Sequence, residues 1–295
     1  MRLRRSELST PASNEHMMER AAASAADLVF LDLEDSVAPA EKESARDKAV
    51  RALKTLDWGR KTRAVRVNGL ETRYAFEDII QVVTEAGDRL DLLIVPKVKS
   101  AEDVRWVDVL LRQLEEKLGR RRPVALEVLI EEVEAMINVD AIARACPRLE
   151  ALIFGPGDYS GSQGVRLDAI SSYPGDVWHY ARNRIVVAAR AAGIDAVDGP
   201  YPDIRKPEGY RTEATRASVL GFAGKWAIHP SQIEIANEVF APTAKEAEQA
   251  RRLVAAMAEA EAAGQGAAVL DGRMIDAATV RIARNVLRRA ELISM

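Results

Sequence analysis

Two short segments decide the fold: Val-Leu-Ile-Glu-Glu at residues 128–132 and Leu-Ile-Phe-Gly-Pro-Gly-Asp-Tyr at residues 152–159. Each is an apolar run that ends abruptly in a carboxylate. Apolar runs of this length are typical of strands buried on both faces of a parallel sheet. Because α/β folds bind ligands at the carboxyl ends of their strands, Glu131 and Asp158 are expected to converge on one hard cation.

Further strand-like runs alternate with helical patterns on both sides of these segments. Repeated strand–helix units favour a parallel sheet with right-handed crossovers, and about eight strands fit a (β/α)8 TIM barrel. An open doubly wound sheet is the alternative, although no Gly-x-Gly-x-x-Gly follows the first strand. The strands are expected at Leu28–Leu33, Ala64–Val67, Leu92–Val95, Ala125–Ile130, Ala151–Phe154, Asp195–Val197, Gly221–Phe222 and Trp226–Ile228.

The sequence changes character after Pro242. A long helix rich in alanine, glutamate and arginine is expected at Ala244–Ala263, and a last helix at about Ala277–Leu292. We therefore expect a TIM-barrel catalytic domain at 1–240 and a C-terminal helical extension at 241–295. Its composition predicts order, so the extension should pack on its own barrel or on a neighbouring subunit.

Composition excludes several classes of protein. The 295 residues carry a formal net charge of -3 without a basic domain, so nucleic acid is not an expected partner. No apolar run is long enough to span a membrane, and no signal-peptide core is present. The single cysteine rules out an intrachain disulfide and suits a cytoplasmic protein. The arginines near the start, Arg2, Arg4 and Arg5, are interpreted as a solvated terminus or a phosphate contact.

The type of metal follows from the donor residues. Histidine is scarce, with three in the chain, which argues against zinc. Mg2+ needs only one or two carboxylates, because water and substrate oxygens complete its coordination. An alternative is that Glu131 or Asp158 serves as a helix cap or an ion-pair partner. The nearby competitors for the metal are Glu127, Glu132 and Glu134.

Other candidate residues follow the strands. Asp32, Glu34 and Asp35 would repel one another unless a cation lies among them, so they either support the metal and its waters or cap a helix. Arg66 suits bidentate binding of a carboxylate or an oxyanion, and it could also pair with Glu34 or Asp35. Lys97 gives a similar but weaker signal. The glycines before Asp158, including Gly157, would let backbone N–H groups approach a small anion.

Taken together, these residues resemble the citrate lyase β-subunit-like family of CoA-ester lyases, within the HpcH/HpaI aldolase superfamily. The resemblance covers nearly the whole chain in order. The matching segments include residues 4–8, 25–39, 56–61, 65–70, 96–98, both carboxylate strands, 197–201, 224–232 and 274–276.

The resemblance implies reversible aldol-type cleavage of a 3-hydroxyacyl-CoA, such as L-malyl-CoA or β-methylmalyl-CoA, to acetyl-CoA or propionyl-CoA plus glyoxylate. It implies Mg2+, with Mn2+ possible, on Glu131 and Asp158, and an α-keto acid on Arg66. It also implies that Asp276 is the catalytic base, supplied by an adjacent subunit of a homotrimer or homohexamer. Contacts with the substrate and CoA are implied for Ser9, Thr10, Asn14, Arg20, Gly157, Asp158, Ile228 and His229.

Some positions depart from the family pattern. Ala12 follows Pro11 where glycine is common, Asn14 stands where relatives often have arginine, and the segment 164–178 is short. Citramalyl-CoA lyase and malyl-CoA thioesterase activities therefore stay open, as does a CoA-independent pyruvate aldolase. A lone histidine such as His229 is more often structural. An alternative of another class is a non-catalytic CoA-binding subunit.

Overall fold

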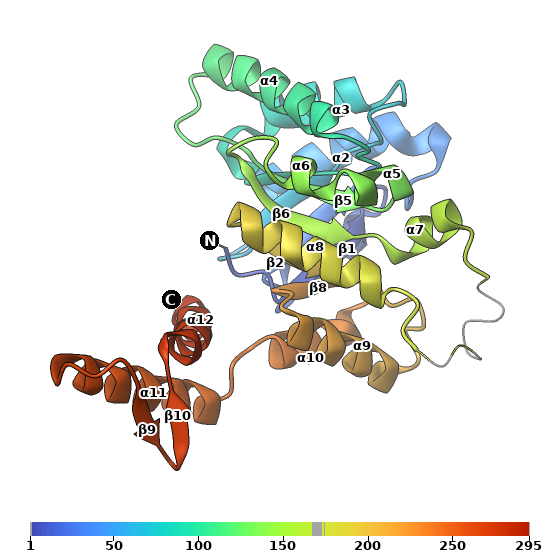
Figure 1. The fold of residues 1–295 in the computed structure, drawn as a ribbon. Coiled ribbons are helices and arrows are strands. Elements are labelled where there is room, and N and C mark those ends of the chain that lie inside the picture. The colour runs from blue at the N-terminus through green and yellow to red at the C-terminus, as the bar shows by residue number, and fades with distance from the viewer. Residues whose placement is uncertain (1, 167–172, 174, 295) are drawn as a thin grey trace. The chain divides into compact units, whose positions relative to one another are not determined.

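The structure, a computed structural model, describes residues 2–166, 173 and 175–294. Its central element is a closed barrel of parallel strands, in which each strand pairs with the next in sequence order and the last pairs with the first (Figure 1). The prediction of a (β/α)8 TIM barrel is therefore confirmed, and the alternative of an open doubly wound sheet is excluded. The strands are β1 (Ser6–Pro11), β2 (Leu28–Asp32), β3 (Thr62–Arg66), β4 (Leu92–Val95), β5 (Ala125–Ile130), β6 (Leu149–Phe154), β7 (Asp195–Asp198) and β8 (Gly224–Ala227).

Helices connect the strands and cover the outside of the barrel (Figure 1). In α4, Ser100 and Asp103 form a capping box at the start, and Gly119, at φ 62°, ends the helix. The apolar side chains of α4 recur at helical spacing and are buried. The helices of this part are α1 (Glu15–Ala22), α2 (Lys42–Thr55), α3 (Ala75–Ala86), α4 (Ala101–Leu118), α5 (Val133–Ile137), α6 (Val139–Ala143), α7 (Pro156–Gln163), α8 (His179–Ala192), α9 (Pro207–Leu220) and α10 (Ile233–Val239).

The structure differs from the expected strands at two places: one strand was missed, and one expected strand is absent. Ser6–Pro11, which was not expected to be a strand, forms β1 and closes the barrel between β2 and β8. Polar side chains hide the strand pattern of this segment in the sequence. Their partners lie far away along the chain: Glu7, for example, accepts a 3.0 Å hydrogen bond from the indole N–H of Trp226. Gly221–Phe222 is not a strand, since Gly221 at φ 110° ends α9.

The amino end of the barrel contains a buried ion cluster. The side chain of Arg4 is 2% exposed and pairs with Glu127, with Glu150 at 3.1 Å and with Asp195 at 3.3 Å. The interpretation of Arg4 as part of a solvated terminus or a phosphate contact is therefore wrong. Glu127 lies in this cluster, which removes it as a competitor for a metal at the opposite end of the strands.

Side chains inside the barrel come from alternate strand positions, as the pleat requires. The interior cluster includes Leu28 and Phe30 of β2, Ala64 of β3 and Leu129 of β5. Continuing the same alternation to the carboxyl ends brings Asp32, Arg66 and Glu131 to the inside. The barrel therefore selects Glu131 over Glu132, a choice that the sequence left open.

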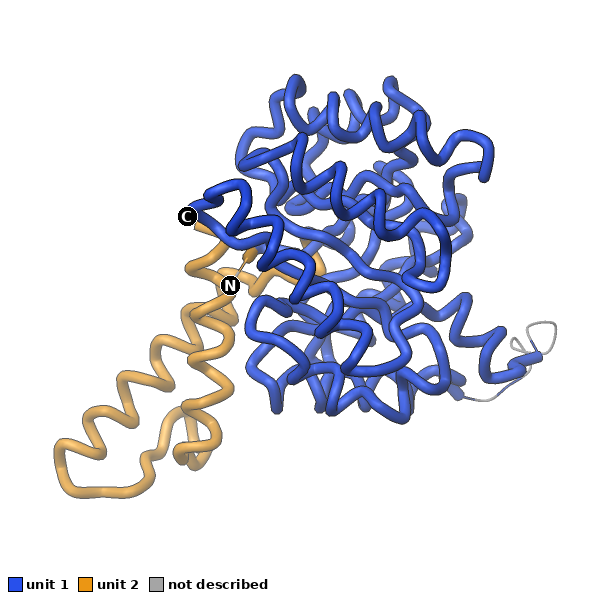
Figure 2. Tube along the Cα trace, turned by 90° about the horizontal axis from the view of Figure 1, so that it is seen from above, with its two compact units in different colours: residues 1, 3–237 blue, residues 2, 238–295 orange. Residues whose placement is uncertain are grey.

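Residues after the barrel form a second compact unit, drawn in orange in Figure 2. The units are Leu3–Asn237 and Glu238–Met295. The second comprises α11 (Ala244–Ala262), an antiparallel pair of strands, β9 (Ala268–Leu270) and β10 (Arg273–Ile275), and α12 (Ala277–Ser294). Met257, Ile275 and Val280 form its small core. Among the described residues, no helix has the length and apolar character needed to cross a membrane.

Candidate active site

A cavity of about 450 Å³ opens at the carboxyl ends of the barrel strands. Most of the residues predicted from the sequence to act on a metal or substrate line it. They are Ser9, Asp32, Asp35, Arg66, Glu131, Gly157, Asp158 and Ile228. Pro11, Met17, Pro200 and Trp226 also line the cavity and were not predicted as site residues. The sequence could have suggested Trp226 as a site residue, because it is an aromatic residue near the end of the strand that precedes Ile228.

Arg66 is held rigidly at the inner end of β3. Its Nε and Nη2 atoms each donate a 2.7 Å hydrogen bond to Asp32, and Nη1 lies 2.9 Å from Glu34 Oε2. The guanidinium lies over the ring of Trp226, 5.4 Å from its centroid. Burial acts to lower the pKa of Arg66, but the charge of Asp32 outweighs it and raises that pKa. Arg66 is therefore a permanent cation with a fixed plane.

Glu131 is buried beneath the loop that follows β6. Its Oε1 accepts a 2.7 Å hydrogen bond from the backbone N–H of Lys97. A Cβ at position 155 would lie 2.5 Å from Glu131 Cβ and 2.6 Å from Oε2, so only Gly155 lets the carboxylate fit. Burial, together with the charge of Glu34, raises the pKa of Glu131 to about 8.

Asp158 lies in the first turn of α7, and its side chain is 46% exposed. Pro156 begins this helix, and Gly155 precedes it without a side-chain cap. The carboxylate is therefore available to a ligand, and the helix dipole favours a negative charge there. Neither Glu131 nor Asp158 acts as the helix cap that the sequence allowed as an alternative.

The acidic segment after β2 divides into three roles. Asp32 accepts backbone N–H groups of Glu34 and Ser36 and binds Arg66. Burial would raise the pKa of Asp32, but Arg66 lowers it overall. Glu34 bridges Arg66 and Lys97, and burial raises its pKa despite those two cations. Asp35 is more than half exposed at the cavity rim.

Lys97 contributes more to the site than the sequence suggested. Its Nζ lies 2.8 Å from Glu34, 3.6 Å from Asp35 and 3.9 Å from Asp158. Burial acts to lower the pKa of this ammonium, but the bond to Glu34 and the neighbouring carboxylates raise it. The sequence contained a signal for this role. Pro96 and Lys97 follow the apolar run Leu92–Val95, so Lys97 comes just after the end of its strand, much as Arg66 comes at the end of the previous one.

The residues suggested for CoA do not all gather at the cavity. Ser9 and Ile228 line it, whereas Thr10 is buried and does not. Asn14 caps α1 by accepting the backbone N–H of Met17 at 3.1 Å, and Arg20 is exposed in the last turn of that helix. His229, next to Ile228, is exposed and accepts the N–H of Ser231.

Asp276 lies in the second compact unit, where it has a local structural contact. One of its carboxylate oxygens accepts the backbone N–H and the hydroxyl of Thr279, both at 2.8 Å, at the start of α12. These hydrogen bonds lower the pKa of Asp276. In this conformation it is an ionised helix cap.

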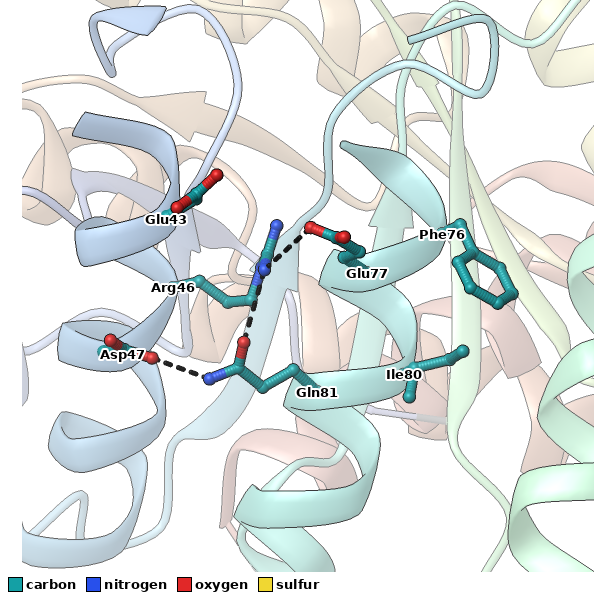
Figure 3. A pocket seen from close by; sticks show the side chains of 7 residues that line it. All are labelled: Glu43, Arg46, Asp47, Phe76, Glu77, Ile80 and Gln81. Carbon is teal, nitrogen blue, oxygen red and sulfur yellow. Dashed lines mark hydrogen bonds and ion pairs between the residues drawn. The ribbon is translucent and has the colours of Figure 1, made fainter. Parts of the chain in front are cut away.

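A second pocket lies between α2 and α3 and has a different character (Figure 3). Within it, Arg46 bonds to Glu77 at 3.4 Å and Gln81 at 3.3 Å, and Gln81 bonds to Asp47 at 2.7 Å. The lining residues of this pocket come from the helices α2 and α3, and none comes from the carboxyl end of a strand. The barrel cavity is the candidate active site.

The donors of the barrel cavity fit a hard divalent cation. Across the described residues, no group of three His, Cys, Asp or Glu side chains is gathered as a ready-made metal cage. Two carboxylates on one open cavity suit Mg2+, which keeps several waters and binds substrate oxygens. Burial, together with the charge of Glu34, raises the pKa of Glu131, and a bound cation would offset this effect.

Comparison with known proteins identifies the family of the chain. Residues 5–230 match the family model described as HpcH/HpaI aldolase/citrate lyase, and the chain belongs to that family. It is 44% identical to an L-malyl-CoA/β-methylmalyl-CoA lyase of Cereibacter sphaeroides, over 98% of this chain and 95% of that protein. A (3S)-malyl-CoA thioesterase of the same species is 39% identical, over 98% and 95% of the two chains.

Solved structures show the same likeness. The structure resembles protein CitE from Mycobacterium tuberculosis, solved in complex with magnesium, acetoacetate and coenzyme A. The two share 30% identity with a TM-score of 0.75, over 97% of each chain.

Proposed function

We propose that the protein is a divalent-metal-dependent CoA-ester lyase that cleaves L-malyl-CoA or β-methylmalyl-CoA to glyoxylate and acetyl-CoA or propionyl-CoA. Near full-length similarity to enzymes with those names supports the substrates. The observation that carries the chemistry is that Arg66, Glu131 and Asp158 line a single cavity at the carboxyl ends of the strands. Arg66, together with a divalent cation held by the two carboxylates, would suit an α-keto acid, which presents a carboxylate and a carbonyl oxygen.

Glu131 and Asp158 are the residues that would hold Mg2+, with Mn2+ as a substitute. When bound, the cation supplies Lewis-acid polarisation of the α-keto acid and fixes its orientation. Magnesium in the related CitE complex supports this assignment. Gly155 and the Lys97 N–H hold Glu131 in place before any ligand arrives, which reduces the reorganisation needed for binding.

Arg66 would stabilise the oxygen on which charge changes during the reaction. In cleavage, the hydroxyl of the substrate loses its proton, the carbon–carbon bond to the acyl-CoA portion breaks, and its electron pair forms the thioester enolate. The hydroxyl oxygen becomes the carbonyl of glyoxylate. The contacts with Asp32 and Glu34 leave N–H donors of the guanidinium for this oxygen, and Trp226 supports the plane from one side.

The enolate carbon must then receive a proton, and in the reverse direction a base must remove one from the acyl-CoA. We assign this role to Asp276 of a neighbouring subunit in a homotrimer or homohexamer. The assignment rests on the family resemblance. In this conformation Asp276 caps α12 through Oδ1, so proton transfer requires the carboxylate to leave the cap or to use Oδ2.

CoA is assigned to the side of the cavity formed by β1, α1 and β8. Ser9, Met17 and Ile228 line the cavity on that side, and β1 pairs directly with β8. Asn14, Arg20 and His229 lie close to these residues in sequence, on elements that flank the same strands. A cytoplasmic enzyme is expected, in agreement with the free Cys146.

The test is to incubate the protein with L-malyl-CoA and Mg2+, trap glyoxylate with phenylhydrazine and follow free thiol in parallel. Glyoxylate without thiol identifies a lyase. Thiol without glyoxylate identifies a thioesterase, which is the alternative because a (3S)-malyl-CoA thioesterase is also among the relatives. Glu131→Gln should abolish either activity, whereas Glu134→Gln, at an exposed position of α5, should retain it. Absence of both products, with the same result for β-methylmalyl-CoA and citramalyl-CoA, would refute the proposed function and favour a non-catalytic CoA-binding protein.

A further inference from the structure

Lys97 has a backbone conformation that is unfavourable for its residue type. Its φ of 53° lies in the left-handed region, which only Asp271 shares among the described non-glycine residues. Such a conformation is strained for a residue with a Cβ and persists where surrounding contacts require it. Here it directs the backbone N–H of Lys97 to Glu131 Oε1 at 2.7 Å.

The same residue directs its ammonium to the other side of the site. The Nζ atom lies within 4 Å of carboxylates on two different segments: Glu34 and Asp35 in the loop after β2, and Asp158 in the first turn of α7. Lys97 therefore contacts Glu131 through its backbone and Asp158 through its side chain.

The charges of the site do not balance. Five carboxylates, Asp32, Glu34, Asp35, Glu131 and Asp158, stand against two cations, Arg66 and Lys97. A divalent cation offsets most of this excess, but an α-keto acid then brings a further negative charge. Because charges a few ångströms apart interact strongly in a partly buried site, one ammonium influences both binding steps with opposite sign.

We propose that Lys97 is a positioning residue and the fixed counter-charge of this site, which weakens binding of the divalent cation alone and strengthens binding of the α-keto acid to the loaded site. This inference rests on the proposed function. Lys97 would thereby affect the order of binding, because the site would bind the metal weakly alone and more tightly together with the α-keto acid.

The experiment removes the ammonium while keeping the backbone N–H. Lys97→Gly is the safest variant, because glycine adopts a φ of 53° without strain, and Lys97→Met keeps the length of the side chain. Lys97→Arg retains the charge. The matched control is Lys99→Met, which removes the same charge two residues away, where Lys99 pairs with the exposed Glu71.

Two binding constants are measured by calorimetry for each folded variant: MgCl2 without substrate, and glyoxylate at saturating Mg2+. In Lys97→Gly and Lys97→Met, Mg2+ should bind about tenfold more tightly and glyoxylate about tenfold more weakly. Lys97→Arg and Lys99→Met should bind both with constants close to those of the parent protein.

The opposite signs exclude a merely structural role, because disorder of the site would weaken both constants. Weakening of both, no change in either, or an Arg variant that behaves like the Met variant would overturn the inference and leave the proposed function intact. If the parent protein bound neither Mg2+ nor glyoxylate, the proposed function would fail, and this inference with it.

Discussion

Asp32 and Arg66 are register partners on the neighbouring strands β2 and β3, and their side chains form two parallel hydrogen bonds of 2.7 Å. Both residues end their strands, so the pair joins the two strand ends at the cavity. The carboxylate fixes both the position and the plane of the guanidinium. This arrangement gives the site a cation that cannot lose its proton and cannot rotate away.

Replacement of Arg66 by lysine should show that geometry matters in addition to charge. An ammonium cannot bind Asp32 through two parallel bonds and still face the cavity, so we expect kcat/KM to fall by about 100-fold. Steady-state kinetics in the condensation direction, with glyoxylate varied, provide the measurement. Arg63→Lys is the control, because Arg63 of the same strand makes an equivalent pair with Asp91 away from the cavity. Equal losses in the two variants would contradict the role of Arg66.

Mg2+ binding should depend on pH through Glu131. The metal binds the ionised carboxylate, and the pKa of Glu131 is about 8 in the metal-free protein, so binding below that pH must release a proton. The dissociation constant for Mg2+ should therefore rise as pH falls below about 8 and level off above it. Calorimetry between pH 6.5 and 9 in buffers with different ionisation enthalpies measures the constant and the proton release. A constant that does not change over this range would contradict the raised pKa.

Gly155→Ala should disrupt the metal site without a change of charge. The added Cβ would overlap Glu131, so the carboxylate or the β6 loop must shift. We expect Mg2+ affinity to fall at least tenfold, as measured by direct titration. Gly161→Ala is the control, because that position in α7 has open space and alanine favours a helix. Retained affinity in Gly155→Ala would show that the close contact is not required.

Asp276→Asn separates the proposed base from the helix cap. Asparagine caps helices about as well as aspartate, so the second unit should keep its fold and its thermal stability. Loss of the carboxylate should lower the exchange of acetyl-CoA methyl protons with deuterated water by about 1000-fold, while Mg2+ and CoA still bind. Asp271→Asn, in the adjacent turn, should exchange at the parent rate. Full exchange in Asp276→Asn would refute its role as the base.

Arg4→Met should destabilise the barrel from its amino end. It would leave Glu127 buried without its cation, and breaking a buried ion pair costs about 3–5 kcal/mol. The measured quantity is the midpoint of urea unfolding followed by circular dichroism. Arg105→Met, which removes an exposed pair with Glu102, should change stability by less than about 1 kcal/mol. A shift in Arg4→Met as small as that of the control would contradict the burial of this cluster.

The sequence by itself determined the architecture and predicted most of the residues that line the candidate active site. Alternating strands and helices predicted the barrel, because short apolar runs can be buried only in a parallel sheet covered on both faces. The limits of Leu92–Val95 and Ala125–Ile130 were predicted as the structure has them, since an apolar run is a local signal. Carboxylates at strand ends predicted a cation site, and the structure places Glu131 and Asp158 on one cavity.

The tertiary structure decided what local patterns cannot contain. β1 was missed because the partners of its polar side chains lie far away in sequence, as Trp226 does for Glu7. The alternation across the closed barrel selected Glu131 over Glu132. Lys97 acquired its place in the site because a left-handed backbone turns its N–H toward Glu131 and its ammonium toward Glu34 and Asp158, which follow three different strands. Register, closure and long-range charge pairing are properties of the folded chain, so only the fold could reveal them.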